Sequence, residues 1–147
     1  MSSSCFITPY DPKAWEDPDD KSEKPKSDLK IWREVFRTAL IDRWTPSEVQ
    51  ESYFGGWVLT KGKATPQGIS DEVRVLLHDD NQVVSFYNHL TPLILEFILW
   101  YRKFVPKRYS LYYFDSTSWD SVLLTEETTE QDLIAFLAHV NDKCKRW

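Results

Sequence analysis

Two aspartates in the segment Tyr113-Phe-Asp115-Ser-Thr-Ser-Trp-Asp120 are the residues best placed to do chemistry. Asp115 comes where a predicted strand ends, a position at which open α/β enzymes often carry acidic catalytic residues. Asp115 and Asp120 could then act as a general acid and base. A phosphoaspartyl hydrolase would need a second Asp two positions after the first, but Thr117 stands there, so we exclude that class. The alternative is structural, because Asp and Ser in a loop between strands usually form turns.

Glu96 and Arg102 are charged residues on a predicted helix that is otherwise mostly apolar. A carboxylate held among aromatic side chains could have a raised pKa and act as an acid, or it could face a ligand cleft. The simpler interpretation, which we favour, is that Glu96 and Lys103 form a thin solvated edge of the helix. Arg102 projects from another side, where it could bind an anion or pair with Asp115.

Other arrangements that could support chemistry have better structural explanations. His78-Asp79-Asp80-Asn81 could supply metal ligands, but these residue types are also typical of a turn, and no second His or Cys cluster is present. Cys5 and Cys144 lie in no setting that would lower a thiol pKa, and we expect both to be reduced. The sequence contains no nucleophile elbow, phosphate-binding loop or dinucleotide fingerprint. We therefore predict no cofactor, no metal and no catalytic residue.

Aromatic residues are the other candidates, because Trp and Tyr bury a large area at small entropic cost. Trp32, Trp44 and Trp100 fall on apolar stripes and are predicted to be core residues. Trp119 lies in a polar loop and is the first candidate for an exposed functional aromatic. The predicted ligand or partner site therefore consists of Glu96, Arg102, Tyr113, Asp115, Trp119 and Asp120.

The elements that must position these residues follow from periodicity and capping signals. A helix over 90–105 should be the centre of the fold, because residues 93–104 include only three charged side chains. A second helix is predicted over 28–44, and a third from Thr128 or Thr129. Strands are predicted near 5–9, 53–61, 73–78, 82–87, 109–115 and 121–125. The order β-α-β-β-β-α-β-β-α predicts an α+β domain with three helices and a mixed, mainly antiparallel sheet of about five to six strands.

We expect residues 1–147 to form a single domain with a loosely ordered arm over 10–27. That segment is rich in Asp and Pro and contains little that is apolar except Trp15.

Composition excludes several classes of partner. The net charge of −5 disfavours non-specific binding to nucleic acid, which depends on Lys and Arg. The apolar run at 90–105 contains Glu96 and falls short of the roughly 20 residues of a membrane span. With no secretion signal visible, we expect a cytoplasmic protein.

Residues 90–137 resemble small uncharacterised bacterial proteins, some of which resemble immunity proteins that neutralise toxins. The resemblance rests on Phe97-x-x-Trp100-Tyr101-Arg102-x-x-Val105-Pro106, Leu111-Tyr-Tyr-Phe-Asp115, Val122-Leu-Leu-Thr125 and the helix start Thr128-Thr-Glu-x-Asp-Leu133. It implies an acidic, non-enzymatic α+β domain and supplies no catalytic residue.

The leading functional hypothesis is a non-enzymatic cytoplasmic binding protein, with an acidic, aromatic-bearing surface that covers a basic protein partner. The alternative is a small-molecule-binding protein or hydrolase with a cleft near Glu96 and Asp115. A structural subunit of a homo-oligomer is the third hypothesis.

Overall fold

The computed structural model describes residues 4–11, 27–44, 49–51, 55–61, 71–87, 92–116, 118 and 120–145. Its elements are β1 (Ser4–Thr8), α1 (Arg33–Trp44), β2 (Val49–Glu51), β3 (Trp57–Lys61), β4 (Asp71–Leu77), β5 (Val84–Tyr87), α2 (Pro92–Phe104), β6 (Leu111–Asp115), β7 (Ser121–Leu124) and α3 (Glu130–Lys145). The α+β class is confirmed, and the described residues form three helices, as predicted, and seven strands, slightly more than predicted. The short strand β2 is the addition. Residues 12–26, most of the predicted arm, lie outside the described residues.

The strands form one sheet in the order β2-β3-β4-β5-β1-β6-β7. β1 lies between β5 and β6 and is antiparallel to both. The chain leaves β5, passes through α2 and returns as β6 on the other side of β1. Because β1 lies between them, β5 and β6 do not pair with each other. Every pairing among the described strands is antiparallel, so the sheet predicted as mixed and mainly antiparallel contains no parallel pair within this part of the chain.

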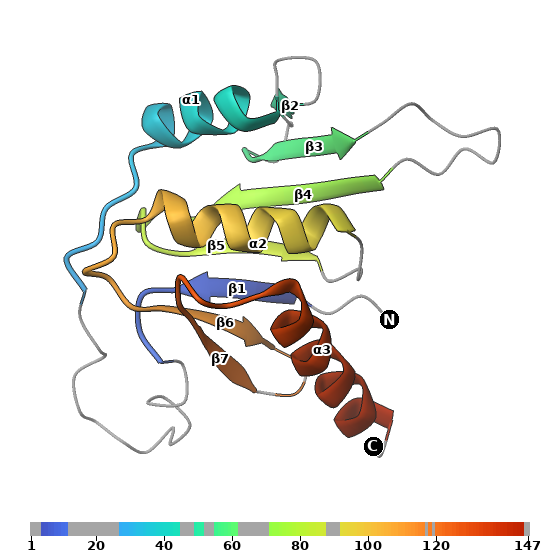
Figure 1. Ribbon diagram of the computed structural model, residues 1–147. Helices are drawn as coiled ribbons and strands as arrows, with labels where there is room; N and C mark the ends of the chain where they lie inside the picture. Colours follow the sequence, from blue (N-terminus) through green and yellow to red (C-terminus); the bar gives the residue numbers. More distant parts are fainter. Residues whose placement is uncertain are drawn as a thin grey trace, which may run out of the picture.

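All three helices pack on one face of the sheet. In Figure 1, α2 runs across the middle of the sheet, with α1 toward β3 and α3 toward β6 and β7. The strand register places the inward side chains of β3, β5 and β6 on the same face. Each helix contacts one of them through an aromatic pair, with centroid distances of 5.1, 5.7 and 5.5 Å for Phe36–Trp57, Phe97–Phe86 and Phe136–Tyr113.

Helix α1 begins at Arg33, five residues later than predicted, because residues 27–32 are not helical. From Asp28 to Trp32 exposed and buried residues alternate, with Leu29 and Ile31 buried, which is the pattern of an extended segment. The Ile31 N–H donates to the carbonyl of Asn81 at 2.8 Å, which holds this segment against the β4–β5 turn. The change of period from helical to extended turns Trp32 outward. Its predicted place in the core is therefore wrong, and its side chain is 60% exposed.

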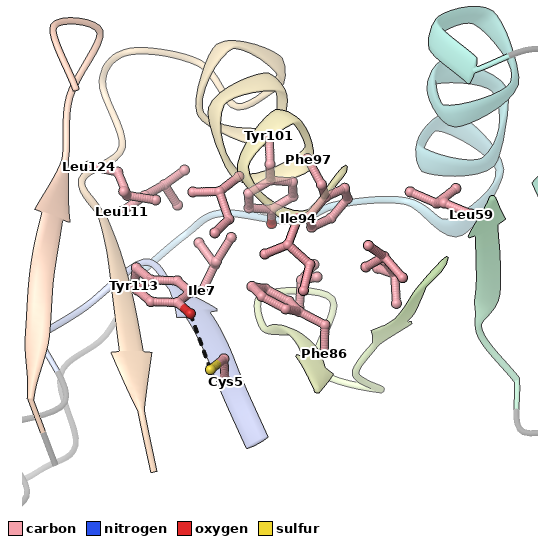
Figure 2. Packing of buried hydrophobic residues seen from close by; sticks show 14 of the residues in the cluster. Cys5, Ile7, Leu59, Phe86, Ile94, Phe97, Tyr101, Leu111, Tyr113 and Leu124 are labelled. Carbon is pink, nitrogen blue, oxygen red and sulfur yellow. Dashed lines mark hydrogen bonds between the residues drawn. The ribbon is translucent and has the colours of Figure 1, made fainter. Parts of the chain in front are cut away.

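Helix α2 is the predicted central helix, and seven of its residues are buried. Figure 2 shows Ile94, Phe97 and Tyr101 of this helix above the side chains of the sheet. At α3, the Thr129 hydroxyl accepts from the Asp132 N–H and the Asp132 carboxylate accepts from the Thr129 N–H, at 3.2 and 2.9 Å. This reciprocal cap selects Thr129 rather than Thr128 from the two predicted starts. Among the described residues, no helix is both long and apolar enough to cross a membrane.

Candidate functional site

Asp115 is fully buried at the end of β6. Its Oδ1 accepts a hydrogen bond from the Ser118 N–H at 3.0 Å, and its own N–H donates to the carbonyl of Asp120 at 3.0 Å. Its Oδ2 lies 3.6 Å from the thiol sulfur of Cys5. Asp115 therefore closes the β6–β7 turn from inside the protein, which is the structural alternative that we considered for this residue.

Cys5 and Tyr113 extend this polar cluster into the core. The Tyr113 hydroxyl donates to the Cys5 sulfur at 3.2 Å, as Figure 2 shows, and both side chains are fully buried. Burial raises the pKa of Tyr113 well above its ordinary value, and Cys5 and Asp115 raise it further. The cluster contains a thiol, a phenol and a carboxylate, yet none of the three side chains is exposed to a substrate. The hydrogen bonds of this cluster link β1 to β6.

Sequence reasoning missed the role of Cys5. Cys5 and Asp115 are 110 positions apart, and they meet because β1 pairs with β6. Alternation along β1 would have placed Cys5 on the core face with Ile7. Only the order of strands in the sheet shows which carboxylate it meets.

Asp120 faces a different neighbour. Its Oδ2 lies 3.6 Å from Nε2 of His139 on α3, and its backbone N–H donates to the Ser118 hydroxyl at 3.2 Å. Asp115 is directed into the core while Asp120 is directed toward α3, so this arrangement gives no support to a general acid–base pair. Trp119 lies outside the described residues.

Glu96 links two helices. Its Oε2 lies 3.8 Å from a guanidinium nitrogen of Arg43 on α1, and its side chain is partly exposed. Glu96 thus lies where α1 and α2 meet the solvent. This position agrees with the solvated edge that we favoured for this residue. Neither Glu96 nor Asp115 lines the two surface depressions described below.

Arg102 has a structural use that we did not predict. It is 5% exposed and donates to the carbonyls of Tyr109, Val105 and Pro106, at 2.9, 3.1 and 3.0 Å. These carbonyls lie just beyond the end of α2, in the connection to β6, and the Pro106 carbonyl also accepts from the Tyr109 N–H at 3.1 Å. Burial lowers the pKa of Arg102, while Glu126 opposes this effect. The guanidinium thus stabilises the α2–β6 connection through hydrogen bonds to its backbone. This role replaces both predicted roles, which were anion binding and pairing with Asp115.

The segment His78–Asn81 forms the β4–β5 turn, as its residue types indicated. Asn81 has a φ of 59°, and Asp80 accepts from the N–H groups of Gln82 and Val83 at 2.9 and 3.2 Å. Within the described ranges, no group of three or more His, Cys, Asp or Glu side chains is arranged to hold a metal ion.

The solvent side of α1 combines acidic and apolar side chains. We call it the outer face of α1, and it consists of Glu34, Val35, Thr38, Ala39 and Asp42. These residues line a shallow depression of about 460 Å³. Val35 is 55% exposed, and Trp32, just before the helix, is 60% exposed. The sequence alone did not single out this side of the helix, and it placed Trp32 in the core.

The basic residues of α1 engage other partners. The Arg33 guanidinium lies 4.4 Å from the ring centre of Trp57, and that of Arg43 lies 5.0 Å from the ring centre of Trp44. Arg37 forms a 3.0 Å ion pair with Glu51 of β2. In contrast, no salt bridge within the described part of the chain reaches Glu34 or Asp42. The outer face of α1 is therefore acidic around an apolar centre.

A second depression, of about 340 Å³, lies beside the end of β7. Its wall includes Arg102, which already serves the backbone, and the exposed Leu123. It also includes Lys107 and Glu126, which form a 3.0 Å ion pair with each other. Its charges are thus largely balanced by one another.

The comparisons with known proteins give no neighbour for this chain. No family model, no curated protein and no solved structure matches it. The resemblance of residues 90–137 to immunity-like proteins therefore stays a prediction.

Proposed function

We propose that this protein is a non-enzymatic binding protein that acts through the outer face of α1 together with Trp32. The observation that carries the proposal is the exposure of Val35 on α1 and of Trp32 just before it, together with Glu34 and Asp42 on the same side of the helix. Exposure of large apolar side chains to water is unfavourable. An exposed apolar patch is therefore typical of an interaction site.

The two kinds of side chain would serve different steps of binding. Val35 and Trp32 supply area to bury, and buried aromatic residues often carry much of the free energy of an interface. Glu34 and Asp42 supply a negative rim that accelerates encounter with a positive partner and disfavours acidic ones. The net charge of −5 acts in the same direction. A basic protein is therefore the partner that this surface favours.

The cytoplasm is the compartment that we propose for this activity, and an immunity-like role remains the most specific form of the hypothesis. In that form the partner would be a toxin whose basic surface is covered. The gene neighbourhood would bear on this point directly, because immunity proteins and their toxins are expected side by side.

The alternative, a hydrolase or small-molecule-binding protein with a cleft near Glu96 and Asp115, has less support. Asp115 is fully buried with partners inside the protein, and Glu96 lies near Arg43. A carboxylate acting on a substrate must be able to reach it. This geometry therefore supports the binding protein over the hydrolase or small-molecule-binding protein.

The experiment compares two charge-reversed variants in pull-downs from lysate of the source organism. The test variant is Glu34→Lys with Asp42→Lys, and the matched control is Glu127→Lys with Glu130→Lys. Both change the net charge equally, and each removes one acid from the first turn of a helix, Glu34 in α1 and Glu130 in α3. We expect the control to retain the partner and the test variant to lose it. Equal retention by both variants would refute the proposal.

A further inference from the structure

We infer that the partner segment bound by the outer face of α1 is a basic amphipathic helix whose positive residues are two turns apart. This inference rests on the proposed function and specifies its partner. It derives from how the acidic, apolar and small side chains are arranged along α1.

The outer face of α1 consists of two adjacent rows. Glu34, Thr38 and Asp42 are four residues apart and form one row, and Val35 and Ala39 form the next. At a rise of about 1.5 Å per residue, the two acids are about 12 Å apart along the axis. Thr38 and Ala39, between them, are small. The face therefore has a negative group toward each end and a low, mostly apolar centre.

This surface suits a helix better than an extended peptide. An extended segment gains affinity mainly from backbone hydrogen bonds to a sheet edge. A helix surface cannot provide these, because its N–H and C=O groups are bonded within the helix. Rows of side chains four residues apart instead form ridges and grooves that accept the ridges of another helix. The small centre at Thr38 and Ala39 lets a second helix approach closely.

Charge complementarity then fixes the spacing on the partner. Two turns of a helix span about 11 Å, so Lys or Arg residues seven or eight positions apart would meet Glu34 and Asp42. Residues between them that pack on Val35 and Ala39 should be apolar or small. Basic groups on α1 do not compete for the acids, since Arg33, Arg37 and Arg43 contact Trp57, Glu51 and Trp44.

A displayed peptide library tests this inference with defined probes. Helical 16-residue peptides, randomised on one face, are selected for binding to the full-length protein. The binding of the enriched peptides to the variant with Glu34→Lys and Asp42→Lys is then measured. The Glu127→Lys and Glu130→Lys variant serves as the matched control. Folding of each variant is confirmed by circular dichroism.

The expected result is enrichment of peptides with Lys or Arg seven or eight positions apart around apolar or small residues. Their affinity should fall by more than about tenfold in the test variant, because each lost ion pair becomes a like-charge contact. The control variant should bind as wild type does. Moving one basic residue of an enriched peptide by two positions should weaken its binding.

The two remaining outcomes separate this inference from the proposed function. Peptides that depend on Glu34 and Asp42 but lack the basic spacing would overturn the inference and leave the proposed function standing. If no enriched peptide is sensitive to Glu34→Lys and Asp42→Lys, the inference is overturned for this helix surface. In that case the pull-down comparison alone decides the proposed function, because it uses natural partners.

Discussion

Replacing Arg102 by Met should destabilise the fold substantially, although Arg102 takes no part in the proposed binding surface. Arg102 is 5% exposed and donates three hydrogen bonds to the carbonyls of Val105, Pro106 and Tyr109. Methionine fills a similar volume and can preserve much of the packing. The substitution therefore removes the charge and the donors and leaves the acceptors in place.

The magnitude follows from where these acceptors lie. The hydrogen bond to Val105 is buried, whereas those to Pro106 and Tyr109 are only partly buried. A buried acceptor left without a partner costs about 1–3 kcal/mol, and partly exposed acceptors recover some of their loss from water. Loss of the buried charge returns some desolvation free energy. We therefore expect the free energy of unfolding to fall by about 2–4 kcal/mol, out of a typical total of about 5–15 kcal/mol.

Urea unfolding of wild type, Arg102→Met and two further variants, Lys103→Met and Arg102→Lys, measures this difference. The matched control is Lys103→Met, at an exposed neighbouring position on the same helix, which should change stability by less than about 0.5 kcal/mol. Arg102→Lys keeps the charge but cannot span three carbonyls, so it should fall between wild type and Arg102→Met. The reasoning fails if Arg102→Met matches Lys103→Met within error at an unchanged slope.

Three further predictions concern the core and Trp32. Cys5→Ala should lower the free energy of unfolding by about 1–3 kcal/mol because it leaves the buried Tyr113 hydroxyl without its acceptor. In chemical unfolding, the double variant with Tyr113→Phe should lose less than the sum of the two single variants, and simple additivity would contradict the hydrogen bond. Trp32→Ala should change stability by less than about 0.5 kcal/mol, whereas Trp57→Ala should cost about 3–5 kcal/mol; equal melting temperatures would contradict the opposite placements of these residues. Burial raises the pKa of Tyr101 and Tyr113 in the folded state. Their contribution to the free energy of unfolding is therefore complete below about pH 10, the pKa of an unfolded tyrosine, and is lost as pH rises above it. Unfolding measured between pH 9 and pH 11 should show stability falling above about pH 10, less steeply in Tyr113→Phe, and identical slopes would count against this assignment.

The helices and strands with strong local signals could be predicted from the sequence. The near-continuous apolar character of 90–105 indicated the central helix, which the structure places at Pro92–Phe104, and residue types at 78–81 indicated the turn between β4 and β5. The strand predicted over 109–115 was equally clear from its aromatic run, and it is found at Leu111–Asp115. In each case the signal lies within a few residues of the element that it specifies, so no knowledge of the rest of the fold was needed.

The candidate site depended on long-range pairing, which a single sequence does not reveal. Asp115 was identified as a polar residue at a strand end, but its contact with Cys5 requires β1 to lie beside β6. Arg102 was predicted to bind an anion or to pair with Asp115. Its actual acceptors are backbone carbonyls after α2, and no pattern of residue types marks these. Trp32 was misplaced because its spacing from Phe36 fits a helical stripe, while Leu29 and Ile31 equally fit an extended segment. Tertiary packing decided between the two periods.

The central claim is that a partner covers the outer face of α1, and methyl NMR of the full-length protein tests it most directly. Val35 and Ala39 carry methyl groups at the centre of this face, and Leu123 carries methyl groups on the exposed part of β7. On addition of the partner recovered by pull-down, the account predicts large shifts or broadening of the Val35 and Ala39 signals with Leu123 unchanged. Unperturbed Val35 and Ala39 signals in the saturated complex would contradict it.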